Sequence, residues 1–308
     1  MSRVPPRSKP ATKTSKKPSS NGRKEPRRTD VRQGEHSRAE SKRTELKHTE
    51  PKRGEPKRAA SGREHEQKVY GEKACLVLFA ERPEAIIRLY VNEAMAPKCA
   101  ALMKYLAKQK KAYHIVADAE LEKVAGSQHH GGVVLLVKQP ESRSIESYLR
   151  ATKNNKQDLI LALDGVSNPH NLGAIARTCA HFGVKALLMA DAQLLHSGAA
   201  VRTAAGGAEF VEGVRCAQLP SALLQCQKAG YQLLSTSSHK GESLYKLALP
   251  AKAVMVFGEE MFGVSKQVAQ KADVLLKIPG TGKVESLNVG VAAALIVGEW
   301  FRQHSGSK

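Results

Sequence analysis

The sequence predicts an α/β protein built around a mostly parallel sheet, and three observations indicate this fold. From residue 158 onward, short apolar runs typical of strands alternate with segments of helical periodicity. The segments between strands are long enough to hold the crossover helices that parallel strands require. Polar and glycine-rich groups follow three of the strands, where an open parallel sheet binds its ligands.

The first 66 residues differ in composition from the rest of the chain. They hold 20 of the 49 Lys and Arg residues and 9 of the 29 Asp and Glu residues, and they contain no aromatic residue. Such a segment buries too little apolar surface to offset its ordering entropy, so we expect residues 1–66 to form a disordered basic tail. Two interpretations stay open: an RNA-binding arm that gains affinity by counterion release, or a solubilising tail without an assigned partner.

A small α/β unit is predicted over residues 67–140. Its expected elements are an apolar run at 74–80, a helix-to-strand passage at 85–91, a helix at 97–109, a strand at 113–116, a helical turn at 121–125 and a strand at 133–137. Residues 141–157 are polar and are predicted to be a linker, helical in part.

A larger α/β unit is predicted over residues 158–308. Its strands are expected at 159–163, 185–189, 210–214, 232–235, 253–257 and 274–278. Its helices are expected at 171–182, 199–205, 219–229, 265–271 and 286–301, the last with Ser286 as N-cap. This alternation places helices on both faces of the sheet.

Charge and cysteine content narrow the partners and the compartment. The net charge is +20, and both the tail and the remaining chain are basic, so nucleic acid is a better partner than a membrane. The five cysteines form no Cys-x-x-Cys pair, which favours reduced structural thiols and a cytoplasmic protein. No apolar run has the length of a membrane span, and we expect no secretory signal.

The glycine-rich turn and helix over residues 278–294 form the most informative segment. A Walker A loop is excluded because Lys277 stands at its first glycine position and Val284 follows Gly282-Lys283. A Rossmann fingerprint is excluded because Glu285 stands at the position of its third glycine. The turn therefore binds something other than a triphosphate or pyrophosphate in the usual way.

Two further polar groups follow predicted strands. Asn171 and Arg177 come after the strand at 159–163, and an arginine fork there suits a phosphodiester. Gly258 and Glu259 come after the strand at 253–257, where a glycine allows close backbone approach. Taken singly, each has a plainer interpretation: Asn171 as a helix cap, Arg177 as a solvated charge, and Glu259 as a carboxylate at a helix N-terminus.

Other motifs carry less weight. His129-His130 has no matching cluster of metal ligands, so no metal site is predicted. The chain has no Gly-x-Ser-x-Gly elbow, which argues against a serine hydrolase.

Together, in this order and spacing, the three segments resemble the motifs of the SpoU-type (TrmH-like) RNA ribose 2′-O-methyltransferases of the SPOUT superfamily. The resemblance covers residues 158–303. Residues 67–140 resemble the L30e-like substrate-binding domain of the same family, through Tyr70-Gly71 and His130-Gly-Gly-Val-Val134. The resemblance implies a trefoil knot in the C-terminal domain and a homodimer whose active site uses residues of both subunits.

The resemblance also implies the reaction and its residues. A methyl group passes from S-adenosyl-L-methionine to a ribose 2′-OH of structured rRNA or tRNA, without a metal. By position in the motifs, the implied catalytic residues are Arg177, Asn171, Glu259, Ser286 and Asn288, with Arg177 activating the hydroxyl. The implied cofactor contacts are Gly258, Ile278 and Leu287. The sequence departs from the family pattern at Pro279-Gly280 and at Gly290, which affects the packing of the cofactor loop.

A second hypothesis comes from another class of protein. The chain could keep this fold as a non-catalytic RNA-binding or assembly protein. Retention of the five polar residues together argues against it, because a pure binder needs none of them as a set. Which RNA and which nucleotide are modified does not follow from the sequence.

Overall fold

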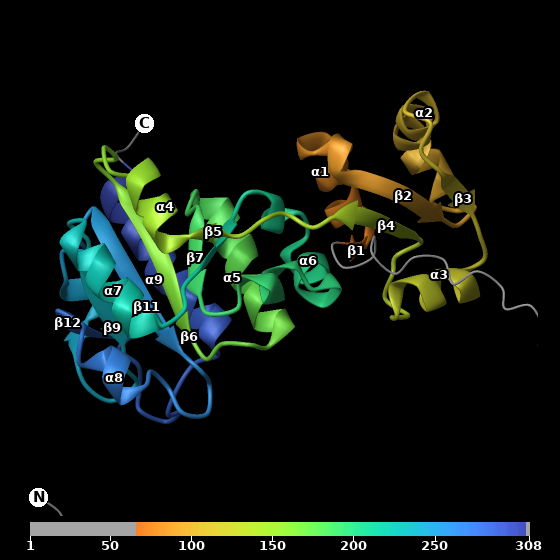
Figure 1. Ribbon diagram of the computed structural model, residues 1–308. Helices are drawn as coiled ribbons and strands as arrows, with labels where there is room; N and C mark the ends of the chain where they lie inside the picture. The colour runs from red at the N-terminus through yellow and green to blue at the C-terminus, as the bar shows by residue number, and fades with distance from the viewer. Residues whose placement is uncertain (1–65, 306–308) are drawn as a thin grey trace, which may run out of the picture. The chain divides into compact units, whose positions relative to one another are not determined.

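A computed structural model describes residues 66–305 and arranges them around two sheets (Figure 1). The predicted basic tail lies outside the described residues, except for Glu66, which begins the first strand. Each sheet has its own helices, and the two sheets differ in strand direction.

The N-terminal sheet has the order β1-β4-β2-β3. β4 is antiparallel to β1 and β2, and β2 is parallel to β3. Its strands are β1 (Glu66–Tyr70), β2 (Ile86–Val91), β3 (Tyr113–Ile115) and β4 (Val133–Lys138). Its helices are α1 (Glu72–Glu81), α2 (Ala100–Lys108) and α3 (Asp118–Ala125), with single 3₁₀ turns η2 (Pro83–Ala85) and η3 (Ala96–Cys99). The sequence did not predict β1, which pairs along its whole length with β4.

The C-terminal sheet confirms the predicted fold class. All its strand pairs are parallel, in the order β10-β12-β9-β11-β6-β7-β8-β5. Its strands are β5 (Arg143–Ser144), β6 (Asp158–Asp164), β7 (Ala186–Met189), β8 (Glu212–Arg215), β9 (Gln232–Thr236), β10 (Glu242–Ser243), β11 (Lys252–Gly258) and β12 (Val274–Lys277). The edge strands β5 and β10 have two residues each, too few to show a pattern in the sequence.

The helices of the C-terminal sheet follow the predicted alternation. They are α4 (Ile145–Ala151), α5 (Pro169–Phe182), α6 (Gly198–Ala204), α7 (Leu219–Lys228), α8 (Lys266–Ala269) and α9 (Val289–His304), with 3₁₀ turns η4 (Ala192–His196), η5 (Gly207–Glu209) and η6 (Leu244–Lys246). The main correction concerns α9, which begins at Val289 rather than at Ser286.

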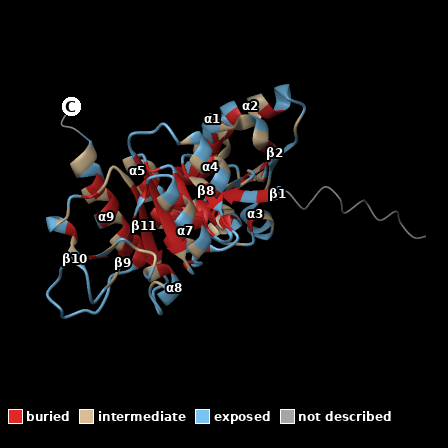
Figure 2. Cartoon of the chain, turned by 60° about the vertical axis from the view of Figure 1, so that its left-hand side comes forward, coloured by how far each residue is buried: buried red, intermediate tan, exposed pale blue. Residues whose placement is uncertain are grey.

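The central strand β6 shows why its sequence reads as a continuous apolar run. Leu159 and Leu161 belong to the core on one face of the sheet, whereas Ile160 and Ala162 belong to the core on the other. Both faces of the sheet are therefore buried. Because the inner strands have no solvent-facing side, their sequences do not alternate apolar with polar residues. Figure 2 shows the strands as the buried layer, with helices exposing their outer sides.

Part of the segment predicted as a linker is packed into the C-terminal sheet. β5 extends the sheet edge, and α4 follows with Ser144 as N-cap. Ile145 and Tyr148 of this helix are 2% and 3% exposed. The polar residues between these two buried side chains hid the helical pattern in the sequence.

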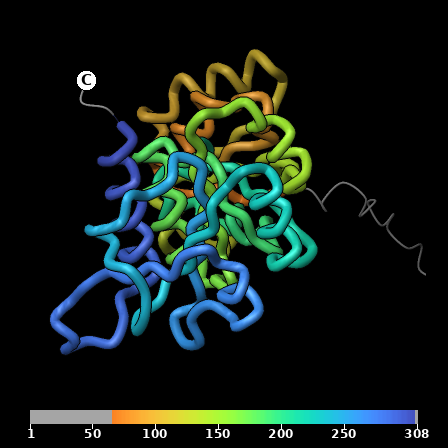
Figure 3. The backbone as a smooth tube through the Cα atoms, turned by 90° about the vertical axis from the view of Figure 1, so that its left-hand side faces the viewer, coloured from red at the N-terminus to blue at the C-terminus, as the bar shows by residue number. Residues whose placement is uncertain are grey.

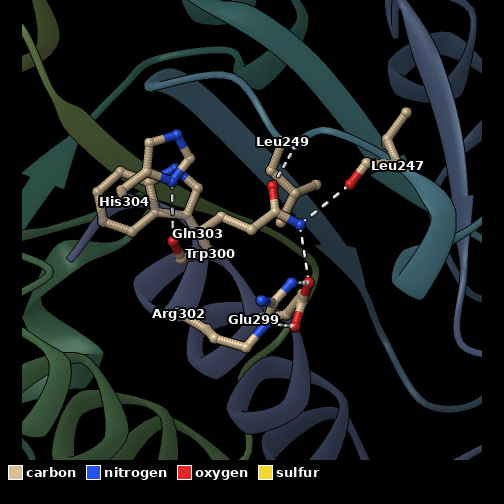
Figure 4. A network of polar contacts seen from close by, with 7 residues as sticks. All are labelled: Leu247, Leu249, Glu299, Trp300, Arg302, Gln303 and His304. Atoms are coloured by element: carbon tan, nitrogen blue, oxygen red, sulfur yellow. Dashed lines mark hydrogen bonds and ion pairs between the residues drawn. The ribbon is translucent and has the colours of Figure 1, made fainter. Parts of the chain in front are cut away.

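The carboxyl end of α9 is fixed by a network of polar contacts (Figure 4). Gln303 Nε2 donates to the carbonyl of Leu247 at 3.0 Å, and Gln303 Oε1 accepts from the amide of Leu249 at 2.8 Å. Trp300 Nε1 donates to the carbonyl of Pro250 at 2.9 Å. Anchoring this end of a rigid helix fixes where its other end lies, which is where the polar residues gather.

Candidate functional site

Asn288 is the centre of the candidate site and the N-cap of α9. Its Oδ1 accepts from the amides of Gly290 and Val291 at 2.9 and 3.3 Å. Its Nδ2 donates to Asn171 Oδ1 at 3.0 Å and to Glu260 Oε1 at 2.6 Å. Two amide donors on one side and two oxygen acceptors on the other fix the orientation of the side-chain amide.

Asn171 belongs to the first turn of α5 and is 9% exposed. It is not the cap of the helix, because Asn168 holds that position and accepts from the amide of His170 at 2.9 Å. The capping interpretation of Asn171 is therefore wrong. Its buried oxygen is turned toward Asn288 instead. This contact joins the first motif in chain order, with Asn171 and Arg177 after β6, to the third, residues 278–294; the second motif is Gly258 and Glu259.

A tight turn after β11 supplies the second motif. The amide of Gly263 donates to the carbonyl of Glu259 at 2.8 Å, and the two residues form an isolated bridge. A Cβ at Gly258 would overlap the backbone of Gly263 and Val264, so only glycine fits there. The turn is thereby held closed, with Glu260, Met261 and Phe262 at its tip.

The two acidic residues of this turn point to different neighbours. Glu260 contacts Asn288, a role that the sequence analysis missed. Glu259 lies against the loop after β6, because a Cβ at Gly165 would come within 3.6 Å of the Cβ of Glu259. The signal was present, since two acids directly follow a strand-end glycine, but sequence alone did not say which one would meet Asn288.

Arg177 lies elsewhere on α5. It is exposed, whereas Asn171 is buried, so the two side chains leave the helix on different sides. Gly207 of η5 packs against its backbone, since a Cβ at Gly207 would lie 2.9 Å from the Cα of Arg177. The chain therefore brings together Asn171 and Asn288, places Glu259 against the loop after β6, and leaves Arg177 facing outward.

The loop from β12 to α9 carries Ser286 and two of the predicted cofactor contacts. Figure 3 shows this blue loop projecting from the rest of the chain. Ser286 is exposed, Leu287 is 48% exposed and Ile278 is half-buried. Within the described part of the chain, none of the amides from Gly280 to Leu287 donates to another backbone group. The loop thus offers backbone groups without backbone partners, which fits a ligand that is bound largely through main-chain contacts.

The parallel sheet explains how the first two motifs meet. β6 and β11 are neighbours, with Asp164 paired to Gly258 in register, so their following loops start side by side. The amide of Ser265 donates to Asp164 Oδ2 at 2.8 Å, which ties the two loops together. β12 is separated from β11 by β9, so the third motif reaches them only through its long loop.

The cysteines and the His129-His130 pair have structural environments. All five cysteines are buried and free, and burial raises the pKa of the Cys179 thiol to about 12. Such thiols are protonated and unreactive at neutral pH. His130 Nδ1 accepts from the amide of Gly132 at 3.1 Å, which closes the turn before β4.

Two protein families match the chain, and together they cover both sheets. The family described as SpoU rRNA Methylase matches residues 158–298. The family described as RNA 2′-O ribose methyltransferase substrate binding matches residues 68–143. The first match contains all three motifs, and the second contains the N-terminal sheet.

Curated relatives agree with these matches. YfiF of Escherichia coli O157:H7, described as an uncharacterized tRNA/rRNA methyltransferase, is 44% identical over 79% of this chain and 70% of its own length. The 23S rRNA (guanosine-2′-O-)-methyltransferase RlmB of Nitrosomonas europaea is 30% identical over 78% of this chain and 93% of its own.

Solved structures share the fold. The SpoU methyltransferase AviRb from Streptomyces viridochromogenes, in complex with AdoMet, has a TM-score of 0.66. It is 20% identical, with 80% of this chain and 93% of that chain covered. The AdoMet-bound rRNA methyltransferase from Sinorhizobium meliloti has a TM-score of 0.65 at 21% identity, with 78% and 88% covered.

Proposed function

This chain belongs to the SpoU rRNA methylase family of S-adenosylmethionine-dependent RNA 2′-O-methyltransferases, and we propose that it methylates a ribose of structured rRNA or tRNA at the site around Asn288. The observation that carries this assignment of the site is the contact of Asn288 with Asn171 and Glu260. That contact joins three segments far apart in sequence at the carboxyl end of one parallel sheet.

We propose that the loop around Gly258, Ile278 and Leu287 holds the cofactor, which supplies an activated methyl group on a sulfonium. The amides and carbonyls of residues 280–287, which bond to no other backbone group among the described residues, suit the polar edges of such a ligand. Leu287 and Ile278 offer apolar surface beside them. The same loops would carry the trefoil knot that the resemblance implies.

A ribose hydroxyl is a weak nucleophile and must lose its proton as it attacks. We assign its activation to Arg177, which also pairs with the neighbouring phosphate through its planar guanidinium. Asn171, Glu259, Ser286 and Asn288 orient the ribose and the cofactor. Asn288 suits this role because its cap and its two donor contacts leave its amide one orientation.

A homodimer would complete the site. Val291 and Leu295 lie one turn apart on α9 and are 50% and 38% exposed, and Leu287, just before the helix, is 48% exposed. Met261 and Phe262, at the tip of the turn that holds Glu260, are 80% and 78% exposed. A second copy that covers this apolar surface would bring its own outward-facing Arg177 toward the Asn288 cluster. We propose this arrangement as the active dimer.

We also propose the predicted domain division, in which residues 67–140 bind substrate and residues 158–308 carry out methyl transfer. Among the described residues no helix is long and apolar enough to cross a membrane. A cytoplasmic location, in contact with RNA, fits the basic composition and the reduced thiols.

The test is methyl incorporation into bulk rRNA and tRNA by the full chain, with cofactor binding measured by calorimetry. Arg177→Ala should abolish incorporation and leave cofactor affinity within a few-fold of the wild type, since Arg177 acts on the hydroxyl. Arg150→Ala, at an exposed arginine of α4, is the matched control and should methylate as the wild type does.

Full incorporation by Arg177→Ala would remove Arg177 from the mechanism. Cofactor binding without incorporation into either RNA would instead favour the non-catalytic RNA-binding or assembly protein.

A further inference from the structure

One face of the N-terminal sheet is covered by α3 on one half and carries exposed residues on the other, the open half. Leu121 and Ala125 of α3 pack against Tyr70 and Val134 on the covered half. On the other half, Lys68, Arg88 and Lys138 are exposed and Leu136 is half-buried; these residues share one face with Tyr70 because they alternate with core residues along their strands.

The strand register places these side chains in rows. Leu136 of β4 is opposite Lys68 of β1 on one side and Arg88 of β2 on the other. Neighbouring strands are about 4.8 Å apart, so the two cationic residues start roughly 10 Å apart across an apolar residue. Glu66 lies at the outer end, opposite Lys138. Across the three strands, cationic side chains therefore flank the apolar side chain of Leu136.

A planar group extends this surface across β2 and β3. The rings of Tyr90 and His114 are stacked, with centroids 5.1 Å apart and planes at 22°. Arg88 Nη1 donates to the hydroxyl of Tyr90 at 3.2 Å, which holds the guanidinium next to the rings. Aromatic rings and guanidinium planes are the groups on which unpaired nucleotide bases stack.

The surrounding charges determine on which half of this face phosphates are favoured. α3, on the covered half, carries Asp118, Glu120 and Glu122, all exposed, and these repel phosphates. β1 begins at Glu66, directly after the strongly basic residues 1–65, so the basic segment joins the chain at this sheet. Phosphates are therefore favoured on the open half and disfavoured over α3.

We propose that this open half is a binding platform for unpaired nucleotides of the RNA, formed by Lys68, Arg88, Tyr90, His114, Leu136 and Lys138. Bases stack on the exposed ring of His114, which rests on the half-buried ring of Tyr90, and phosphates meet the cationic residues on either side of Leu136. The platform rests on the proposed function because it takes the RNA substrate as its ligand. It deepens that function by assigning single-stranded segments, rather than duplex, to this face.

The test is fluorescence anisotropy of the full chain with a short unpaired oligouridylate and with a duplex RNA of the same length. His114→Ala should weaken binding of the unpaired strand roughly 5- to 30-fold, in line with the loss of a stacked base. Arg88→Gln should lower the slope of log affinity against log salt by about one.

Lys228→Gln, at an exposed lysine of α7, is the control for loss of one charge and should change affinity less than twofold. His114 and Arg88 are exposed, so their variants should keep the wild-type melting temperature. Wild-type affinity of both variants for the unpaired strand would overturn the platform. An equal loss on the duplex would overturn the assignment to unpaired nucleotides.

Methyl incorporation by the same preparations separates this proposal from the proposed function. A wild-type chain that binds the unpaired strand through His114 but never transfers a methyl group would refute the catalytic assignment and leave the platform standing. Active variants with unchanged RNA affinity would refute the platform and leave the catalytic assignment standing.

Discussion

The two ends of the parallel sheet each carry a polar cluster, and the clusters differ in exposure. At the amino end of β6, the carboxylate of Asp158 accepts from the hydroxyls of Tyr148 and Tyr231, all within a buried environment. At the carboxyl end, Asn288 joins Asn171 and Glu260 at a surface where Ser286, Leu287 and Glu259 are exposed.

Burial explains the different chemistry of the two ends. Burial, and the nearby Asp158 carboxylate, raise the pKa of Tyr148 and Tyr231 above the usual range, so both phenols stay protonated and donate. Such a closed network stabilises the fold and ties α4 to the sheet. The carboxyl-end cluster is also hydrogen-bonded, but its neighbours face solvent and can meet a ligand. The comparison predicts loss of activity at one end and loss of stability at the other.

The largest expected effect is on catalysis at the carboxyl end. Asn288→Ala removes the group that joins the three motifs, so methyl transfer should fall by roughly 10²- to 10³-fold. The free energy of unfolding should fall by only about 1 kcal/mol, the usual cost of a lost N-cap. Single-turnover methylation and urea denaturation measure the two quantities.

Asn154→Ala, at an exposed asparagine after α4, is the matched control and should change neither. A full-rate Asn288→Ala enzyme would show that the motif contact only caps the helix.

The next effect is on stability at the amino end. Asp158→Ala leaves two buried hydroxyls without their acceptor, and the free energy of unfolding should fall by about 3 kcal/mol. Methyl transfer per folded molecule should stay within a few-fold of the wild type. Denaturant unfolding and cofactor-saturated kinetics below the melting transition check both parts.

Tyr148→Phe removes one donor and keeps the ring, so it should cost less than Asp158→Ala. If Asp158→Ala lowered turnover as much as Asn288→Ala, the division between the two ends would be wrong.

The free energy of unfolding should depend on pH through His196, a histidine that is largely buried. Burial, with Arg82 nearby, lowers the pKa of His196 from near 6.5 to about 4. The unfolded chain therefore takes up a proton before the folded chain does, and this stability is full above pH 6.5 and lost as pH falls toward 4. Between pH 7 and pH 5 the loss should be about 2 kcal/mol. His196→Gln should flatten that part of the stability profile, and an unchanged slope would contradict the assignment.

The smallest effect concerns the N-terminal basic segment. Deletion of residues 1–65 should weaken RNA binding and flatten its salt dependence, while cofactor affinity stays the same. The cut ends before Glu66 because that residue begins β1 and pairs with Lys138. Anisotropy at several salt concentrations measures the slope. An unchanged slope would remove the segment from RNA binding.

The sequence by itself determined the alternation of strands and helices in the C-terminal sheet. Inner strands that are buried on both faces must be continuously apolar, and such runs are visible in the sequence. It also determined which residue types follow the strands. Resemblance in the three motifs gave the family. β1 was missed, because half of its short pattern is polar where it faces the open side of the sheet. The start of α9 was predicted two residues too early as to its N-cap, because Ser286 and Asn288 are both good N-cap residues and only packing selects between them.

The tertiary structure decided which polar residues meet. Asn288 contacts Glu260 rather than Glu259 because the closed turn after β11 aims the second acid at α9. Asn171 turns inward and Arg177 outward, so the chain alone does not gather all five proposed catalytic residues. Sequence sets chemistry through residue types and local periodicity. Contacts between segments more than a hundred residues apart depend on strand order and loop crossing, which no local pattern contains.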